Sequence, residues 1–122
     1  MMYLHKLLLR SCSTVFVSAV LCSCVQAEIK QQPITEDSVN LSAKIFLNEF
    51  VSKDEGARKV ARLYLLGVMD ATEGKTWCDY KKFSTATLNE FIFEYMKKRI
   101  PLQLEQRASA VIEDSLRATF PC

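Results

Sequence analysis

The sequence predicts an all-α fold, a small domain of four helices closed by one disulfide between Cys78 and Cys122. Two observations predict the helices: apolar residues recur at helical spacing in four separate segments, and no stretch alternates convincingly as a strand does. The third observation concerns the cysteines. Only these two lie beyond an N-terminal segment with the features of an export signal.

Residues 1–27 have the layout of a secretory signal peptide that is cleaved on export. Residues 1–10 carry basic side chains and no acid, and residues 11–24 are apolar or small. Val25-Gln26-Ala27 then places small residues at the usual positions before a cleavage site, so we expect the mature chain to begin at Glu28. The apolar run is too short to predict a membrane span.

A lipoprotein signal is the alternative interpretation of the same segment. Leu21-Cys22-Ser23-Cys24 resembles a bacterial lipobox, in which Cys24 would become the acylated first residue. Cys22 is unusual there, because that position normally holds a small or aliphatic residue. Both interpretations take the protein out of the cytoplasm. We expect a periplasmic protein, with a lipoprotein anchored to the envelope as the alternative and no other membrane association.

Removal of the leader leaves residues 28–122 as one small domain of balanced charge. The leader takes Lys6 and Arg10 from the 16 basic residues of the chain, which leaves 14 against 14 acidic residues. The sequence therefore predicts no nucleic-acid partner. A core of this size is marginal without a cross-link.

The disulfide follows from the cysteines that remain. Their number falls from 5 to 2, and an even number in an oxidising compartment favours a bridge. Cys122 ends the chain directly after Pro121, an odd place for a thiol unless the tail is fixed to the domain. Cys78 is its one candidate partner, and a bridge of this span adds on the order of 4 kcal/mol in the chain-entropy model.

The first two helices are expected at residues 35–51 and 55–72. Thr35 to Ser38 offer caps and acids for the start of the first helix. Its apolar stripe consists of Val39, Ala43, Phe46 and Phe50, widened by Ile45 and Leu47. The second helix is apolar on all sides from Leu63 to Met69, which predicts a central helix surrounded by protein. Glu73-Gly74 ends it.

Two residues of the second helix are singled out for helix packing. Gly67 lies within the apolar run, where glycine costs about 1 kcal/mol relative to alanine, so we expect another helix to approach its backbone. Asp70 is expected near the end of the helix with its carboxylate capping a loop amide. A functional role is the alternative for Asp70.

The last two helices are expected to begin near Thr87 and Leu104. Thr87-Leu88-Asn89-Glu90 fits the capping box, and Pro101 stops the third helix. Its buried stripe consists of Leu88, Phe91, Ile92, Tyr95 and Met96. The last helix extends to about Thr119. Its inward residues are Leu104, Ala108, Val111, Ile112, Ser115 and Leu116.

The irregular segment from Gly74 to Phe83 is the candidate partner-binding loop. It combines aromatic and basic residues, a composition favoured at protein interfaces. The candidate contact residues are Lys75, Trp77, Tyr80, Lys81 and Lys82. The alternative is that Trp77 packs over the disulfide and that the lysines form a solvated rim.

The residue types exclude most catalytic chemistry. The single histidine, His5, lies in the leader, so the mature chain builds no Ser-His-Asp or Cys-His arrangement and no usual zinc site. Three glycines provide no phosphate-binding loop, and no Cys-x-x-Cys is present. The paired carboxylates are typical of solvated helix ends: Glu36-Asp37, Asp54-Glu55 and Glu113-Asp114. We therefore expect a binding protein, not an enzyme, with no cofactor and no metal.

Several of these residues also carry a family resemblance. Tyr64, Gly67 and Asp70-Ala71 resemble the Y-x-x-G-x-x-D-A helix of the Rap/Tai immunity proteins. Trp77-Cys78, the Thr87-Leu88 helix start and the closing Phe120-Pro121-Cys122 follow in the same order as in that family. The resemblance covers about Glu55 to Cys122.

This resemblance implies a function. Rap/Tai proteins are small periplasmic helical proteins that neutralise peptidoglycan amidases delivered by type VI secretion systems. They bind the amidase and block its catalytic cleft, and they form homodimers. The resemblance also makes Cys78–Cys122 the disulfide of the family. A second cysteine pair that links the first two helices in many relatives is absent here. A structural or assembly lipoprotein anchored through Cys24 is the alternative function.

Overall fold

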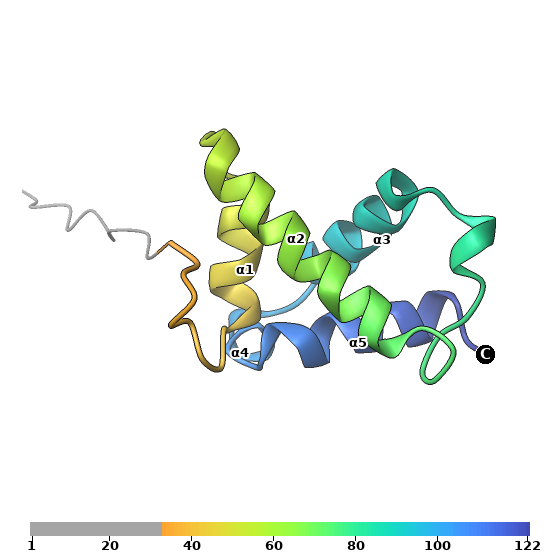
Figure 1. Ribbon diagram of the computed structural model, residues 1–122. Coiled ribbons are helices and arrows are strands. Elements are labelled where there is room, and N and C mark those ends of the chain that lie inside the picture. The colour runs from red at the N-terminus through yellow and green to blue at the C-terminus, as the bar shows by residue number, and fades with distance from the viewer. Residues whose placement is uncertain (1–32) are drawn as a thin grey trace, which may run out of the picture.

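The computed structural model describes residues 33–122, and within them the fold is all-α without a strand (Figure 1). The α-helices are α1 (Ala43–Phe50), α2 (Glu55–Thr72), α3 (Thr85–Lys97), α4 (Pro101–Leu104) and α5 (Ala108–Thr119), and a 3-10 turn spans Tyr80–Lys82. The predicted fold class is confirmed, with the short α4 added to four main helices. The predicted signal peptide and lipobox, residues 1–27, lie outside the described residues.

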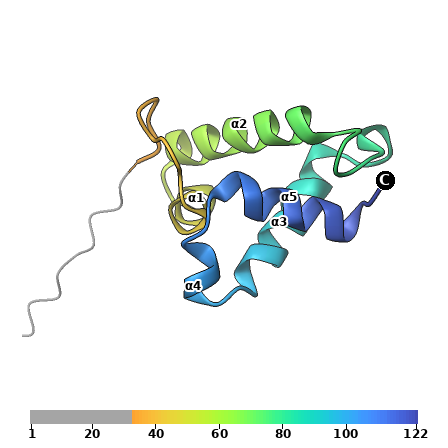
Figure 2. The same cartoon turned by 90° about the horizontal axis from the view of Figure 1, so that it is seen from below.

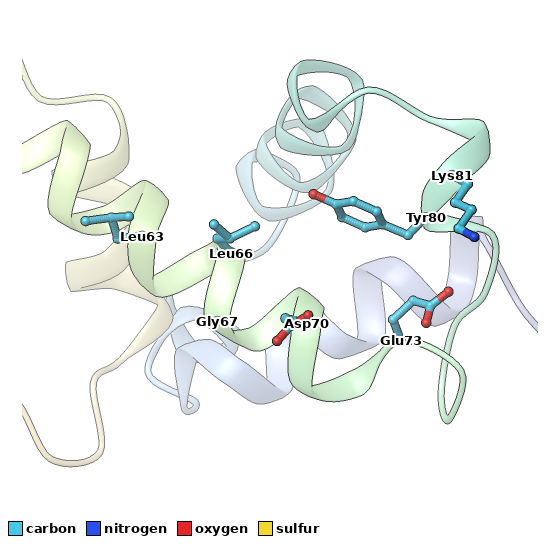
Figure 3. Close-up of a pocket in the computed structure, with 7 residues that line it drawn as sticks. All are labelled: Leu63, Leu66, Gly67, Asp70, Glu73, Tyr80 and Lys81. Carbon is cyan, nitrogen blue, oxygen red and sulfur yellow. The ribbon is translucent and has the colours of Figure 1, made fainter.

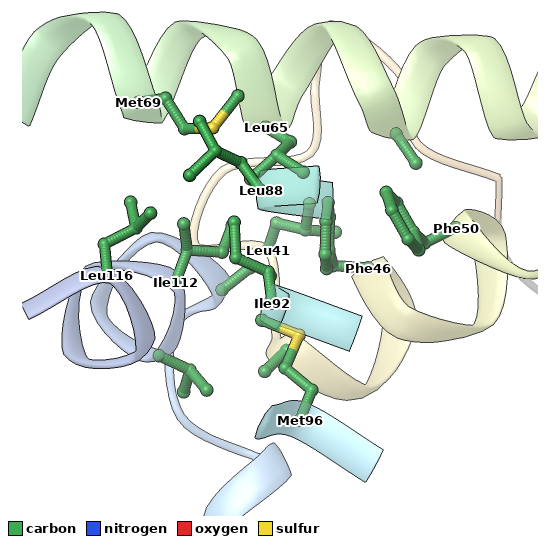
Figure 4. Packing of buried hydrophobic residues seen from close by; sticks show 14 of the residues in the cluster. Leu41, Phe46, Phe50, Leu65, Met69, Leu88, Ile92, Met96, Ile112 and Leu116 are labelled. Atoms are coloured by element: carbon green, nitrogen blue, oxygen red, sulfur yellow. The ribbon is translucent and has the colours of Figure 1, made fainter. Parts of the chain in front are cut away.

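Side chains from the four main helices meet in one hydrophobic core (Figure 4). The largest fully buried apolar side chains are Phe46, Leu65, Met69, Trp77, Leu88, Ile92, Met96, Ile112 and Leu116. α1 packs against α2, α3 and α5, and α5 also packs against α2 and α3. The predicted stripes of α3 and α5 supply much of this core, but Phe91 of the α3 stripe is largely exposed.

The bounds predicted for the second helix are confirmed, but its predicted central position is wrong. Only one side of α2 enters the core, through Ala61, Leu65 and Met69. Figures 1 and 2 show α2 as an outer helix that lies across α1 and α5. Leu63 is 58% exposed and Leu66 is 41% exposed, so one side of the apolar run forms a surface while Leu65 and Met69 are buried.

The first helix begins at Ala43, later than the predicted Thr35. The Thr35 and Ser38 polar groups bond to each other, with Thr35 N donating to Ser38 Oγ over 2.9 Å and Ser38 N donating to Thr35 O over 3.0 Å. Asn40 then takes a positive φ of 60°, which breaks a helix. Ser42 is the actual N-cap, and Val39 is 81% exposed instead of buried.

The predicted last helix begins at Ala108 as α5 and not at Leu104, which is instead the last residue of the unpredicted α4. Residues 41–43 and 106–108 run side by side, with Ala43 N donating to Gln106 O over 2.8 Å and Ala108 N donating to Leu41 O over 2.7 Å. Ala108 is the first residue of α5, so Leu41 O accepts from a helix amide that no side chain caps. α3 also differs from the prediction, because its N-cap is Ser84 and not Thr87.

Candidate partner-binding surface

The disulfide fixes the C-terminal tail to the loop that follows α2. Cys78 and Cys122 are bonded, with their Cα atoms 4.9 Å apart, which confirms the predicted bridge. Next to it, Cys78 N donates a hydrogen bond to Phe120 O over 3.1 Å. The Phe120 ring packs against Phe83 and Phe91, with centroids 4.4 and 5.3 Å away. The last helix and the loop are therefore held together at three points.

Trp77 is a core residue of this loop and not a contact residue. Its side chain is 0% exposed. The indole Nε1 donates to Thr72 Oγ1 over 3.0 Å, and the ring meets the edge of Tyr80 with centroids 5.9 Å apart. Gly74, at a φ of 76°, turns the chain so that its amide donates to Trp77 O over 2.7 Å. The structure thus supports a packed tryptophan, with Thr72 and Tyr80 as its named partners.

The lysines of the loop lie on its surface. Lys75, Lys81 and Lys82 are exposed. The Nζ atom of Lys75 donates to Ala71 O over 3.0 Å, and that of Lys82 pairs with Asp79 over 2.8 Å. Tyr80 is half-buried. The exposed part of the loop is thus one edge of Tyr80 and the three lysines, of which Lys82 is paired with Asp79, and we call Tyr80 and these lysines the lysine loop.

A groove lies between α2 and the lysine loop (Figure 3). It has a volume of about 580 Å³ and is lined by Leu63, Leu66, Gly67, Asp70, Glu73, Tyr80 and Lys81. Tyr80 is held over it by a 3.2 Å hydrogen bond between its hydroxyl and Thr85 Oγ1. A second hollow of about 470 Å³ continues along α2 past the same two leucines. Its lining is Glu55, Arg58, Lys59, Arg62, Leu63, Leu66, Thr85 and Asn89.

Gly67 and Asp70 line this groove and do not pack against a helix. A Cβ atom placed on Gly67 meets nothing within 4 Å apart from its own chain neighbours and helix backbone. The prediction that another helix approaches Gly67 is therefore wrong within the described residues. Asp70 is exposed, and the loop amides it was expected to cap are satisfied otherwise: the Lys75 and Thr76 amides both donate to Thr72 O over 3.1 Å.

Sequence reasoning missed Leu63 and Leu66 as surface residues. The sequence did contain a signal for exposure. Lys59 precedes Leu63 by four residues and Asp70 follows Leu66 by four, which places both charges on the same side of the helix as the leucines. Charged residues that share a helical side with leucines indicate that this side faces water. The unbroken apolar run from Leu63 to Met69 hid that pattern.

The described residues present surfaces for binding and no cluster suited to metal chemistry. Residues 33–122 contain no group of three or more His, Cys, Asp or Glu side chains placed to hold a metal ion. In the same range, no helix is long and apolar enough to cross a bilayer. A compact helical domain with an open groove of mixed apolar and charged lining is of the class that recognises other proteins.

Comparison with known proteins agrees with a protein-binding domain and identifies its family. A family model described as Rap1a immunity proteins matches residues 42–122. The chain belongs to this family, and membership implies an immunity protein that binds a cognate effector protein. The family also suggests an inhibitor without enzymatic activity. A search of curated proteins found no match to the chain.

Proposed function

We propose that this immunity protein acts in the periplasm, where it binds a peptidoglycan amidase delivered by a type VI secretion system and blocks the active-site cleft. The match to Rap1a immunity proteins over residues 42–122 carries the proposal. The leader predicted at residues 1–27 supports export. The Cys78–Cys122 bridge supports an oxidising compartment, because disulfides are rare in the cytosol.

We propose the lysine loop as the contact with the amidase. The bridge, the Cys78–Phe120 hydrogen bond and the buried Trp77 fix the loop before a partner arrives. A loop that is already ordered loses little conformational entropy on binding, which favours affinity. Three exposed cations beside a tyrosine edge would steer an acidic surface of the amidase toward the loop.

Inhibition in this proposal is stoichiometric and needs no chemistry from the immunity protein. The bound domain denies the amidase its cell-wall substrate by covering the cleft. We also propose that the immunity protein acts as a homodimer, as the resemblance to the Rap/Tai family implies. Two lysine loops per dimer would then allow two amidase molecules to be held at once.

Co-expression with a type VI-delivered peptidoglycan amidase, taken from a neighbouring reading frame where one encodes such an enzyme, tests this function. The proposal expects a complex that survives purification and an amidase that no longer hydrolyses peptidoglycan. Lys75→Glu combined with Lys82→Glu should weaken the complex at least tenfold. Lys97→Glu combined with Lys98→Glu, the same change of net charge at two exposed sites on the end of α3, should leave it unchanged. Absence of any complex with such an amidase would overturn the proposed function, and equal binding by all variants would overturn the assigned loop.

A further inference from the structure

The exposed side of α2 has a charge order that its own helix does not favour. Lys59 and Arg62 lie in its first half and Asp70 lies in its last turn. The helix dipole acts within the first and last turns, so of these three residues it bears on Asp70, whose negative charge lies at the unfavourable C-terminal end at a cost of about 0.3–1 kcal/mol. Within residues 33–122, none of these three side chains belongs to an ion pair. The described domain therefore gives no stabilising reason for this order.

The middle of the same side is equally unexplained by contacts within the domain. Gly67 costs about 1 kcal/mol relative to alanine in a helix interior, and the space above it is open. Leu63 and Leu66 flank it and are substantially exposed. Figure 3 shows these residues with Asp70 along one side of α2. We call Lys59, Leu63, Leu66, Gly67 and Asp70 the α2 face.

We propose that the α2 face pairs with the α2 face of a second copy, with the two helices antiparallel about a two-fold axis. This inference rests on the homodimer of the proposed function and assigns its interface. The face is basic at one end, apolar in the middle and acidic at the other end. An antiparallel copy of the same helix presents the reverse order. The basic end of each copy therefore meets the acidic end of the other, and the two apolar middles meet each other.

The spacing of the residues fixes the register of this pairing. Lys59 precedes Leu63 by four residues, and Asp70 follows Leu66 by four. A register that packs Leu63 against Leu66 of the partner subunit therefore places Lys59 level with Asp70 of the partner subunit. The two-fold axis forms each of these contacts twice. In the same register Gly67 lies level with Arg62 of the partner subunit, and its missing side chain leaves room for the arginine stem.

Self-complementarity is the reason to assign the α2 face to a second copy. Packed helix axes are typically 8–10 Å apart, which requires small residues or open hollows at the contact. The hollow of about 470 Å³ along α2 provides that room beside the two leucines, and no lysine-loop residue lines it. In an antiparallel pair, each basic end also lies beside the negative C-terminal end of the neighbouring helix dipole, which is a favourable placement for lysine.

A charge-swap experiment tests the proposal on protein purified after export, as the cell processes it. Sedimentation analysis over a range of concentrations gives the dimer dissociation constant. Lys59→Glu and Asp70→Lys should each raise that constant at least tenfold, because each creates two like-charge contacts per dimer. The double variant should return the dissociation constant to within about threefold of the original value, because it restores an opposite-charge contact at both positions. The tenfold loss in each single variant corresponds to about 1.4 kcal/mol. Lys98→Glu is the matched control and should change nothing.

A second variant separates loss of the interface from loss of the fold. Gly67→Arg places a large side chain in the open space above α2 and should abolish the dimer without lowering the thermal midpoint of the monomer. A chain that stays monomeric throughout, or a double variant that stays as weak as the single ones, would overturn the assignment. So would amidase capture that is lost with Lys59→Glu in a monomeric chain, because the groove would then belong to the amidase. The dimer dissociation constant is measured without amidase, so loss of the dimer is distinguished from failure of immunity.

Discussion

Removal of the disulfide should destabilise the domain by about 4 kcal/mol. Cys122→Ser opens a loop whose ends are separated by 44 residues, and the chain-entropy model converts a loop of that length into this free energy. The total stability of a small domain is about 5–15 kcal/mol, so the loss is a large part of it. The contacts of Phe120 with Phe83 and Phe91 need not change, because they do not require the sulfur atoms.

Urea unfolding followed by circular dichroism measures the effect. Cys78→Ser should cost the same as Cys122→Ser, and the double variant should cost no more than either, because all three remove a single bridge. An unchanged free energy of unfolding in Cys122→Ser would refute the reasoning that the bridge stabilises the domain by restricting the unfolded chain. A double variant that is much weaker than both single ones would show that the cysteines act through separate contacts.

Three further predictions concern the α2 face, the buried tryptophan and the leader. Gly67→Ala should raise monomer stability by about 1 kcal/mol in urea unfolding at low protein concentration, because alanine favours the helix and its methyl group meets open space. A loss of stability would mean that the backbone at Gly67 is closely packed. Trp77→Phe removes the Nε1 donor to Thr72 and part of the ring, and should cost about 1–3 kcal/mol in the same assay, whereas a surface role for Trp77 predicts no change. Mass spectrometry of the exported protein should find Glu28 as its first residue, and a diacylglyceryl Cys24 would instead support the lipoprotein alternative.

The sequence was sufficient to predict those elements whose signals are local. Glu73-Gly74 predicts the end of α2, and the structure ends the helix at Thr72 with Gly74 at a positive φ. The bridge was predictable because Cys78 and Cys122 are the two cysteines that remain after the leader. Both inferences depend on residues whose meaning does not change with tertiary context.

The missed boundaries depend on contacts between distant segments. The pairing of Leu41 and Ala43 with Gln106 and Ala108 starts α1 later than its caps suggested and starts α5 at Ala108. Neither segment shows this pairing by itself, because the partner of each lies more than sixty residues away. Thr35 and Ser38 are good caps in isolation, but here they satisfy each other and begin no helix.

The candidate surface was predicted only in part, for a related reason. Hydrophobicity along a helix does not say which apolar side is covered, so the run from Leu63 to Met69 was assigned to the interior. The loop was found from its composition, but composition could not separate the buried Trp77 from the exposed lysines. The hydrogen bond to Thr72 and the packing against Tyr80 decide that the tryptophan turns inward.

Titration of amidase activity is the most direct test of the immunity function. A peptidoglycan amidase that the immunity protein captures is held at fixed concentration with purified peptidoglycan while the immunity protein is added. The rate of hydrolysis should fall linearly with added immunity protein and reach zero at a ratio of one immunity protein to one amidase, because the bound protein occupies the cleft. Hydrolysis that continues at full rate in the presence of excess immunity protein would contradict it.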